Sequence, residues 1–192
     1  MKRRTFDYLM SAAGLVVVVA LVVAGALLMW GYSFANSNVH DQLAKQEIYF
    51  PSAEAFAHAQ PGTKITPSMI PSVSQYAGQQ LLTGEQAHVW ADDFIAVHLS
   101  EMPYSGVYAT IATHAQNAPK GSAEATKLAQ LEQTSFQGTT LRGLLLEAYA
   151  FSVFGTIAFW AAIASFCLAF IMAVLVGFGF WHAHKTPDSA EL

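Results

Sequence analysis

Charged residues are scarce in this chain. Only 11% of its 192 residues are charged and 54% are hydrophobic, whereas about a quarter of a soluble domain is charged. This deficit predicts a membrane protein. A formal net charge of −4 leaves no basic stripe for nucleic acid, so no nucleic-acid partner is expected. The single cysteine, Cys167, excludes an intramolecular disulfide and a CxxC redox motif.

Two long runs contain no charge at all. The first, "LMSAAGLVVVVALVVAGALLMW", extends from Leu9 to Trp30 and is long enough to cross about 30 Å of hydrocarbon as a helix. Tyr8 and Trp30 would lie about 33 Å apart on a helix, which suits the two aromatic belts of a bilayer. We predict a cytoplasmic N-terminus over residues 1–8 and transmembrane helix 1 over residues 9–31. A cleaved signal peptide is the alternative, but its apolar core is usually about 7–15 residues long, so a retained signal anchor is expected.

The second run, Ala148 to Trp181, is too long for one crossing. Trp160 and Trp181 would lie about 31 Å apart on a helix, which places the bilayer between them. Transmembrane helix 2 is therefore expected over residues 159–181, a cytoplasmic tail over 182–192 and a helix extension above the membrane over 141–158. One face of this extension is apolar: Leu141, Leu144, Leu145, Ala148, Phe151 and Gly155. Arg142 and Glu147 are expected at the interface, where they fix the depth of the helix.

The basic residues predict the orientation. Lys2, Arg3 and Arg4 precede the first span and Lys185 follows the second. The segment 33–140 carries four lysines and nine acidic residues, a formal charge of −5. Because basic residues stay on the cytoplasmic side, both termini are expected inside and residues of about 32–158 outside the plasma membrane.

The segment 32–140 shows no convincing alternating run, so we expect a small helical extracytoplasmic domain and an all-α chain. A short helix should continue from span one through residues 38–50, and the proline-rich stretch after it should be an extended loop. Thr83 and Gln86 have the spacing of a capping box that opens a helix ending near Glu101.

Two further helices are expected beyond Pro103. The first covers residues 104–116, and the second begins at Ser122 as N-cap and runs to about Phe136. Gly138 is expected to kink or break the chain before the membrane helix begins.

The stretch "HVWADDFIAVH", residues 88–98, holds two histidines and two aspartates. At about 100° per residue, Trp90, Phe94 and Val97 share one face and should form the core of the outside domain. His88 and Asp92 lie together on the other side, as a surface pair or as two ligands of a metal site that still needs a third.

No other cofactor is indicated, because the sequence lacks a phosphate-binding glycine loop, GxSxG and CxxCH. The sequence therefore predicts no catalytic residue.

Span two carries a ladder of small residues at i+4 spacing, the pattern by which membrane helices approach closely. Its members are Ala161, Ser165, Ala169, Ala173 and Gly177. Ala20 and Ala24 offer the same spacing in span one. The two spans can pack on each other through these residues, or the ladder can bind a partner or a second copy of the chain.

Three segments, "WGYSFANSNVHDQLAKQEIYFP", "YAGQQLLTGEQAHVWADDFIAVHL" and "TLRGLLLEAYAFSVFGTIA", resemble a family of uncharacterised two-span actinobacterial membrane proteins. Members of that family are sometimes labelled aromatic ring-opening dioxygenases. The resemblance implies the two-span architecture and carries over no catalytic residues, because no converging set of iron ligands is present.

The expected function is non-enzymatic: an accessory, assembly or scaffolding subunit that binds the bilayer and a membrane-protein partner or its own copy. The alternatives are a metal-dependent extracytoplasmic enzyme that uses His88 and Asp92, and an extracytoplasmic ligand sensor.

Overall fold

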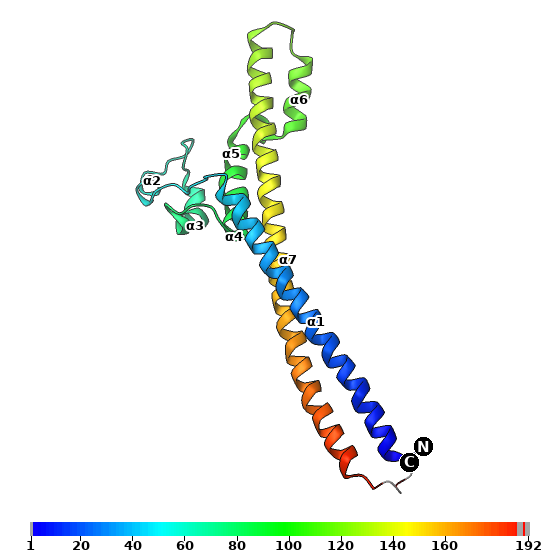
Figure 1. Ribbon diagram of the computed structural model, residues 1–192. Helices are drawn as coiled ribbons and strands as arrows, with labels where there is room; N and C mark the ends of the chain where they lie inside the picture. Colours follow the sequence, from blue (N-terminus) through cyan, green and yellow to red (C-terminus); the bar gives the residue numbers. More distant parts are fainter. Residues whose placement is uncertain (1, 188–189, 191–192) are drawn as a thin grey trace. The chain divides into compact units, whose positions relative to one another are not determined.

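The computed structural model describes residues 2–187 and 190, and its regular structure is helical (Figure 1). The helices are α1 (Arg3–Ala44), α2 (Ala53–Ala57), α3 (Ile70–Val73), α4 (Gly84–Val89), α5 (Ala96–Glu101), α6 (Tyr108–Asn117) and α7 (Ala123–Lys185). Short 3-10 turns cover Pro67–Met69, Ser74–Tyr76 and Pro103–Gly106, and a π-helical segment, Trp90–Ile95, joins α4 to α5. No strand occurs in the described part of the chain.

The chain divides into two compact units. We call Met1–Ala35 with Phe154–Leu192 the hairpin unit, and Asn36–Val153 the middle unit. Both α1 and α7 are long and apolar enough to cross a membrane, and only 11% and 17% of their most apolar windows are buried.

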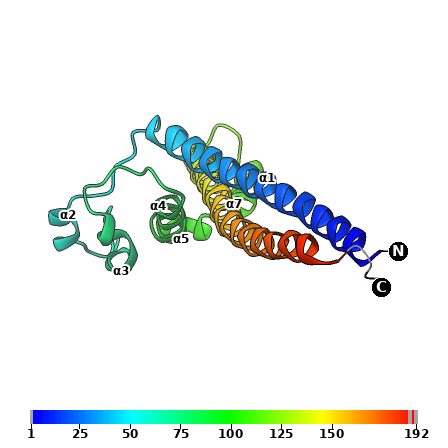
Figure 2. The same ribbon diagram turned by 60° about the horizontal axis from the view of Figure 1, so that its bottom comes forward.

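In the hairpin unit, α1 and α7 run side by side in opposite directions (Figures 1 and 2). The Tyr32 ring lies 5.0 Å from the Phe159 ring and the Tyr8 ring lies 6.1 Å from the Phe180 ring. This register brings the neighbourhood of Trp30 level with that of Trp160.

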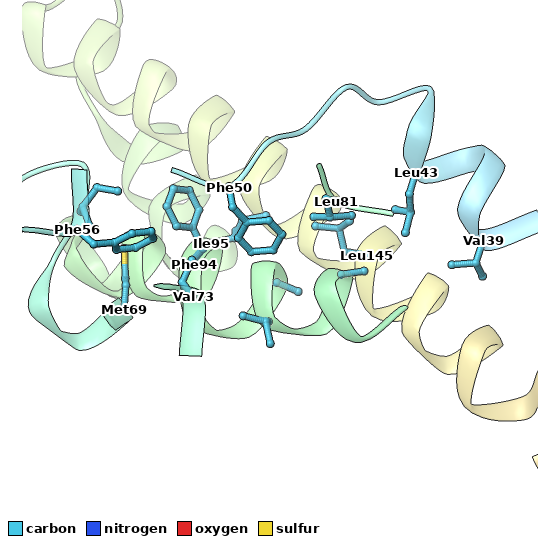
Figure 3. Packing of buried hydrophobic residues seen from close by; sticks show 14 residues of the cluster. Val39, Leu43, Phe50, Phe56, Met69, Val73, Leu81, Phe94, Ile95 and Leu145 are labelled. Atoms are coloured by element: carbon cyan, nitrogen blue, oxygen red, sulfur yellow. The ribbon is translucent and has the colours of Figure 1, made fainter. Parts of the chain in front are cut away.

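The middle unit is built around one apolar cluster (Figure 3). Phe56 and Met69 come from the proline-rich stretch and lie against each other, while Phe94 and Ile95 come from the π-helical segment. Leu145 of α7 is 3% exposed and joins the same cluster. The cluster therefore fastens the segments between α1 and α7 onto α7.

Two local predictions about helix starts are confirmed. Thr83 Oγ1 accepts from Gln86 N, and the Gln86 side chain accepts in return from Thr83 N, which makes the capping box. Ser122 Oγ accepts from Ala125 N at 3.0 Å, so it caps α7 as expected.

Three local predictions are wrong. The helix expected over 38–50 does continue from the first span, but it ends at Ala44, because Glu47 turns the chain with a φ of 51°. The proline-rich stretch forms short helices, because prolines occupy the first turns of two of them. Gly138 does not break α7; a Cβ there would meet Leu99 Cδ2 at 2.9 Å, so the glycine admits a close side chain.

Candidate functional site

The stretch 88–98 lies on α4, the π-helical segment and α5. The π-helical turn spans Trp90–Ile95, so the residues do not follow the regular 100° rotation assumed from sequence. Phe94 is buried in the apolar cluster, and Trp90 and Val97 pack against it. The Trp90 ring stacks 4.2 Å from Phe94 and meets Phe50 edge-on at 5.0 Å.

His88 and Asp92 form a pair. His88 Nε2 lies 3.2 Å from Asp92 Oδ2, and the two side chains are 37% and 35% exposed. A face of the His88 ring is covered by α7: the Tyr149 ring stacks on it at 4.3 Å with the planes 9° apart. The imidazole is therefore held by a carboxylate at its edge and by an aromatic ring on its face.

Arg142 completes the cluster. Its Nη2 donates to Asp92 Oδ1 at 2.6 Å, and its Nε donates to the same oxygen at 3.1 Å. The sequence indicated Arg142 only as an interface group, and the structure shows in addition that its guanidinium binds the carboxylate of Asp92. We name Arg142, Asp92, His88 and Tyr149 the brace, since they join the α4–α5 stretch to α7.

The two helical stretches approach closely beside the brace. Gly84 is the first residue of α4, and a Cβ there would overlap the Cβ of Ser152 and come within 3.3 Å of the Tyr149 Cα. Only glycine lets α4 lie this near α7, which places His88 within stacking distance of Tyr149.

The contacts of Asp92 leave neither of its oxygens free to bind a metal ion. Both carboxylate oxygens of Asp92 already have partners, Arg142 and His88, so a metal ion would have to displace the guanidinium. Within residues 2–187 and 190, no group of three His, Cys, Asp or Glu side chains lies close enough to hold an ion. The brace can fix the α4–α5 stretch against α7, and within it His88 Nε2 contacts Asp92.

The other histidines of the middle unit that make described contacts lie apart from the brace. His98 Nδ1 is 2.8 Å from the Phe94 carbonyl and its Nε2 is 3.0 Å from the Lys64 carbonyl, so this ring ties a loop to α5. His40 pairs with its neighbour Asp41 at 3.3 Å. His114 stacks on Tyr104 at 4.3 Å.

Tyr76 lies beside the apolar cluster, with its ring 5.1 Å from that of Phe50. Burial raises the pKa of its phenol above the ordinary value of 10.0, and the charge of Glu85 raises it further. The phenol is therefore a neutral packing group at physiological pH.

The small-residue ladder divides into two parts in the hairpin unit. Ser165 and Ala169 are buried, and Ser165 Oγ donates to the Leu21 carbonyl at 2.8 Å. Ala161 is half-buried, whereas Ala173 and Gly177 are exposed.

Ala20 and Ala24 are exposed too, so they do not make the contact between the spans. The contact uses residues of α1 that recur every three or four positions: Ser11, Gly14, Val18, Leu21 and Gly25. A Cβ at Gly14 would meet Val176 at 2.7 Å, and one at Gly25 would meet Phe166 at 2.7 Å. Glycine suits these positions better than alanine because the large partners fill the space, and the heptad spacing was the signal that could have identified this face.

The predicted interface anchors lie at the ends of the hairpin unit. Trp30, Trp160 and Trp181 are 66%, 65% and 58% exposed. Lys185 Nζ lies 4.1 Å from the Trp181 ring centre, and the Arg4 guanidinium lies 5.9 Å from that of Tyr8. Lys2 and Arg3 are exposed at the same end as Lys185.

The middle unit has an apolar groove of about 290 Å³. Its floor and walls come from α1 and α7: Val39, Leu43, Leu141, Leu144, Leu145, Ala148 and Phe151. Asn38, Gln42, Gln46 and Glu147 add polar groups to it. Leu144 is 59% exposed and Phe151 is 44% exposed, so the groove is open to the surroundings.

No protein family model matches the chain, and neither curated proteins nor solved structures yield a significant match.

Proposed function

We propose that the protein crosses the plasma membrane twice, with both termini cytoplasmic and the middle unit outside. The pairing of Tyr8 with Phe180 and of Tyr32 with Phe159 supports this placement, because the aromatic belts inferred separately for the two spans then lie at matching levels. Four of the nine basic residues lie at one end of the hairpin unit, which is the end expected inside.

We further propose that the protein is an accessory or assembly subunit without catalytic activity of its own. The observation that carries this is the open apolar groove of the middle unit. Leu141, Leu144 and Phe151 lie in the stretch of α7 expected above the membrane, where lipid chains do not cover them. Exposed apolar surface of this kind marks a protein-binding face.

The partner that suits the groove is an amphipathic or membrane-proximal helix of another membrane protein. Such a helix lays apolar side chains at i, i+3, i+4 and i+7 into a groove between two helices. Asn38, Gln42 and Gln46 lie one turn apart along α1 and the residues just after it, and they offer amide donors and acceptors to its polar edge.

The brace has a structural part in this proposal. It fixes the α4–α5 stretch against α7 and so holds the apolar cluster that supports Leu145 in the groove. A metal-dependent enzyme that uses His88 and Asp92 is the alternative, and metal analysis separates the two: zinc or iron that purifies with the protein and is lost in His88→Ala would favour the enzyme.

A photo-crosslinking amino acid at Leu144 tests the accessory role in native membranes. Position Gln130, also exposed on α7 but away from the groove, is the matched control. We expect one discrete protein adduct from position 144 and none from 130, and Leu144→Glu should abolish co-purification of that protein. Adducts with lipid alone, together with a purified monomer that retains no protein, would contradict the proposal.

A further inference from the structure

Three basic or titratable side chains surround one hollow at the terminal end of the hairpin unit. Arg3 of α1 and His182 and Lys185 of α7 line this hollow of about 250 Å³, together with Thr186, Pro187 and Ala190. Arg3 lies near the start of the sequence and Lys185 near its end. A backbone hydrogen bond joins these two regions, because Arg3 N donates to the Ala190 carbonyl at 3.1 Å. We name this the cationic hollow.

A second, apolar hollow lies on α7 immediately before it. Val174, Gly177, Phe178 and Trp181 line it, and beyond the neighbouring residues and the backbone of α7 itself nothing lies within 4 Å of a Cβ built at Gly177. Positions 174, 178, 181 and 185 fall on one face of the helix. The Lys185 ammonium lies 4.1 Å from the centre of the Trp181 ring, so a positive charge follows directly after the apolar residues on this face.

We propose that this end of the hairpin unit binds one anionic phospholipid, with the phosphate in the cationic hollow and an acyl chain in the hollow at Gly177. Arg3 presents a planar fork of donors that matches phosphate oxygens, and Lys185 adds a point charge with three donors. Trp181 lies between the cationic hollow and the apolar hollow, as tryptophan lies between headgroups and acyl chains in membranes.

The inference rests on the membrane-spanning arrangement and is independent of the accessory role. An acid near this end, Asp7, has its Oδ2 3.9 Å from His182 Nε2, but Asp7 is not among the residues that line the cationic hollow. Among the described residues that line the cationic hollow, Arg3 and Lys185 carry full charges, and both charges are positive.

The test is native mass spectrometry of the full chain in detergent, titrated with dioleoyl phosphatidylglycerol and with dioleoyl phosphatidylcholine. The tails are identical, so a difference reports the headgroup. We expect phosphatidylglycerol to bind at least about fivefold more tightly, and Arg3→Gln and Lys185→Gln each to weaken it about fivefold, the effect of one basic residue near an anionic surface.

The controls separate a site from general charge. Lys2→Gln removes the same charge from the same end outside the hollow and should change affinity less than about twofold, and Lys185→Arg should keep it. Gly177→Leu fills the apolar hollow without altering charge, so it should weaken both lipids, whereas Ala164→Leu on the same helix should not.

Three results would overturn the proposal. These are equal affinity for the two lipids, an equal loss in Lys2→Gln and Lys185→Gln, and displacement of phosphatidylglycerol by millimolar inorganic phosphate. The last result would mean that the hollow binds a free anion. Circular dichroism and size-exclusion profiles of each variant, compared with the parent protein, exclude loss of fold as the cause.

Discussion

The contact between Arg142 and Asp92 allows a quantitative test of the brace. Arg142→Gln and Asp92→Asn remove the ion pair from either side while they keep a polar side chain at each position. The native contact consists of two N–H donors on one carboxylate oxygen, at 2.6 and 3.1 Å. A double-mutant cycle built from these two substitutions isolates the energy of the pair.

The expected coupling is about 1 kcal/mol. Exposed ion pairs contribute about 0.2–1 kcal/mol, and hydrogen bonds to charged groups contribute about 1.5–3 kcal/mol. The Arg142 and Asp92 side chains are 39% and 35% exposed, so solvent screens the pair and keeps the value near the lower range. Asp92→Asn alone should destabilise more than Arg142→Gln, because the neutral amide that replaces the carboxylate also weakens the contact with His88.

Trp90 supplies a local signal for the assay, because it packs against the apolar cluster of the middle unit. Replacing Trp30, Trp160 and Trp181 by tyrosine leaves it as the sole tryptophan, and its fluorescence then follows unfolding of this unit in denaturant. A coupling below about 0.3 kcal/mol, the usual error of additivity, would refute the view of Arg142 and Asp92 as a brace. Coupling that does not fall with added salt would also argue against an ion pair.

Three further experiments test other contacts. Gly84→Ala should lower stability by about 1–3 kcal/mol, because its methyl group overlaps a side chain of α7. Its control, Gly143→Ala, places a methyl group in open space beside α7 and should raise stability by up to about 1 kcal/mol. Comparable denaturant midpoints for the two variants would contradict the close approach. Gly25→Leu should separate the two spans and change the efficiency of disulfide cross-linking between engineered cysteines on them, and unchanged cross-linking would show that the helices meet elsewhere. Because the folded pKa of Tyr76 is raised, its contribution to stability is present below pH 10 and is lost as pH rises through the folded pKa, so stability should fall less above pH 10 in Tyr76→Phe; identical pH profiles would refute this.

The sequence predicts features that depend on neighbouring residues. Thr83 with Gln86, and Ser122 before α7, satisfy backbone donors within three positions, so the pattern is visible in the chain itself. The two apolar helices likewise follow from length and composition alone. The all-α class was predictable for these reasons.

Contacts between distant residues left no such signal. Arg142 and Asp92 are separated by 50 positions, and nothing in either neighbourhood specifies the other as a partner. Gly138 was misinterpreted because a glycine that breaks a helix and a glycine that admits Leu99 look alike in sequence. The π-helical turn at Trp90–Ile95 also has no local signature in the sequence. The rotation of about 100° per residue, which was used to assign faces of the helix, therefore does not hold across it.

The bond from Ser165 to the Leu21 carbonyl joins residues 144 positions apart, and it has a consequence for biosynthesis. A ribosome that adds about 5–20 residues per second needs roughly 7–30 s between these two points. Throughout this interval α1 lacks its partner from α7, so the face that contains Gly14 and Gly25 is not covered by Val176 and Phe166. Correct pairing therefore requires that this face of α1 stay free of other helices until α7 has been made.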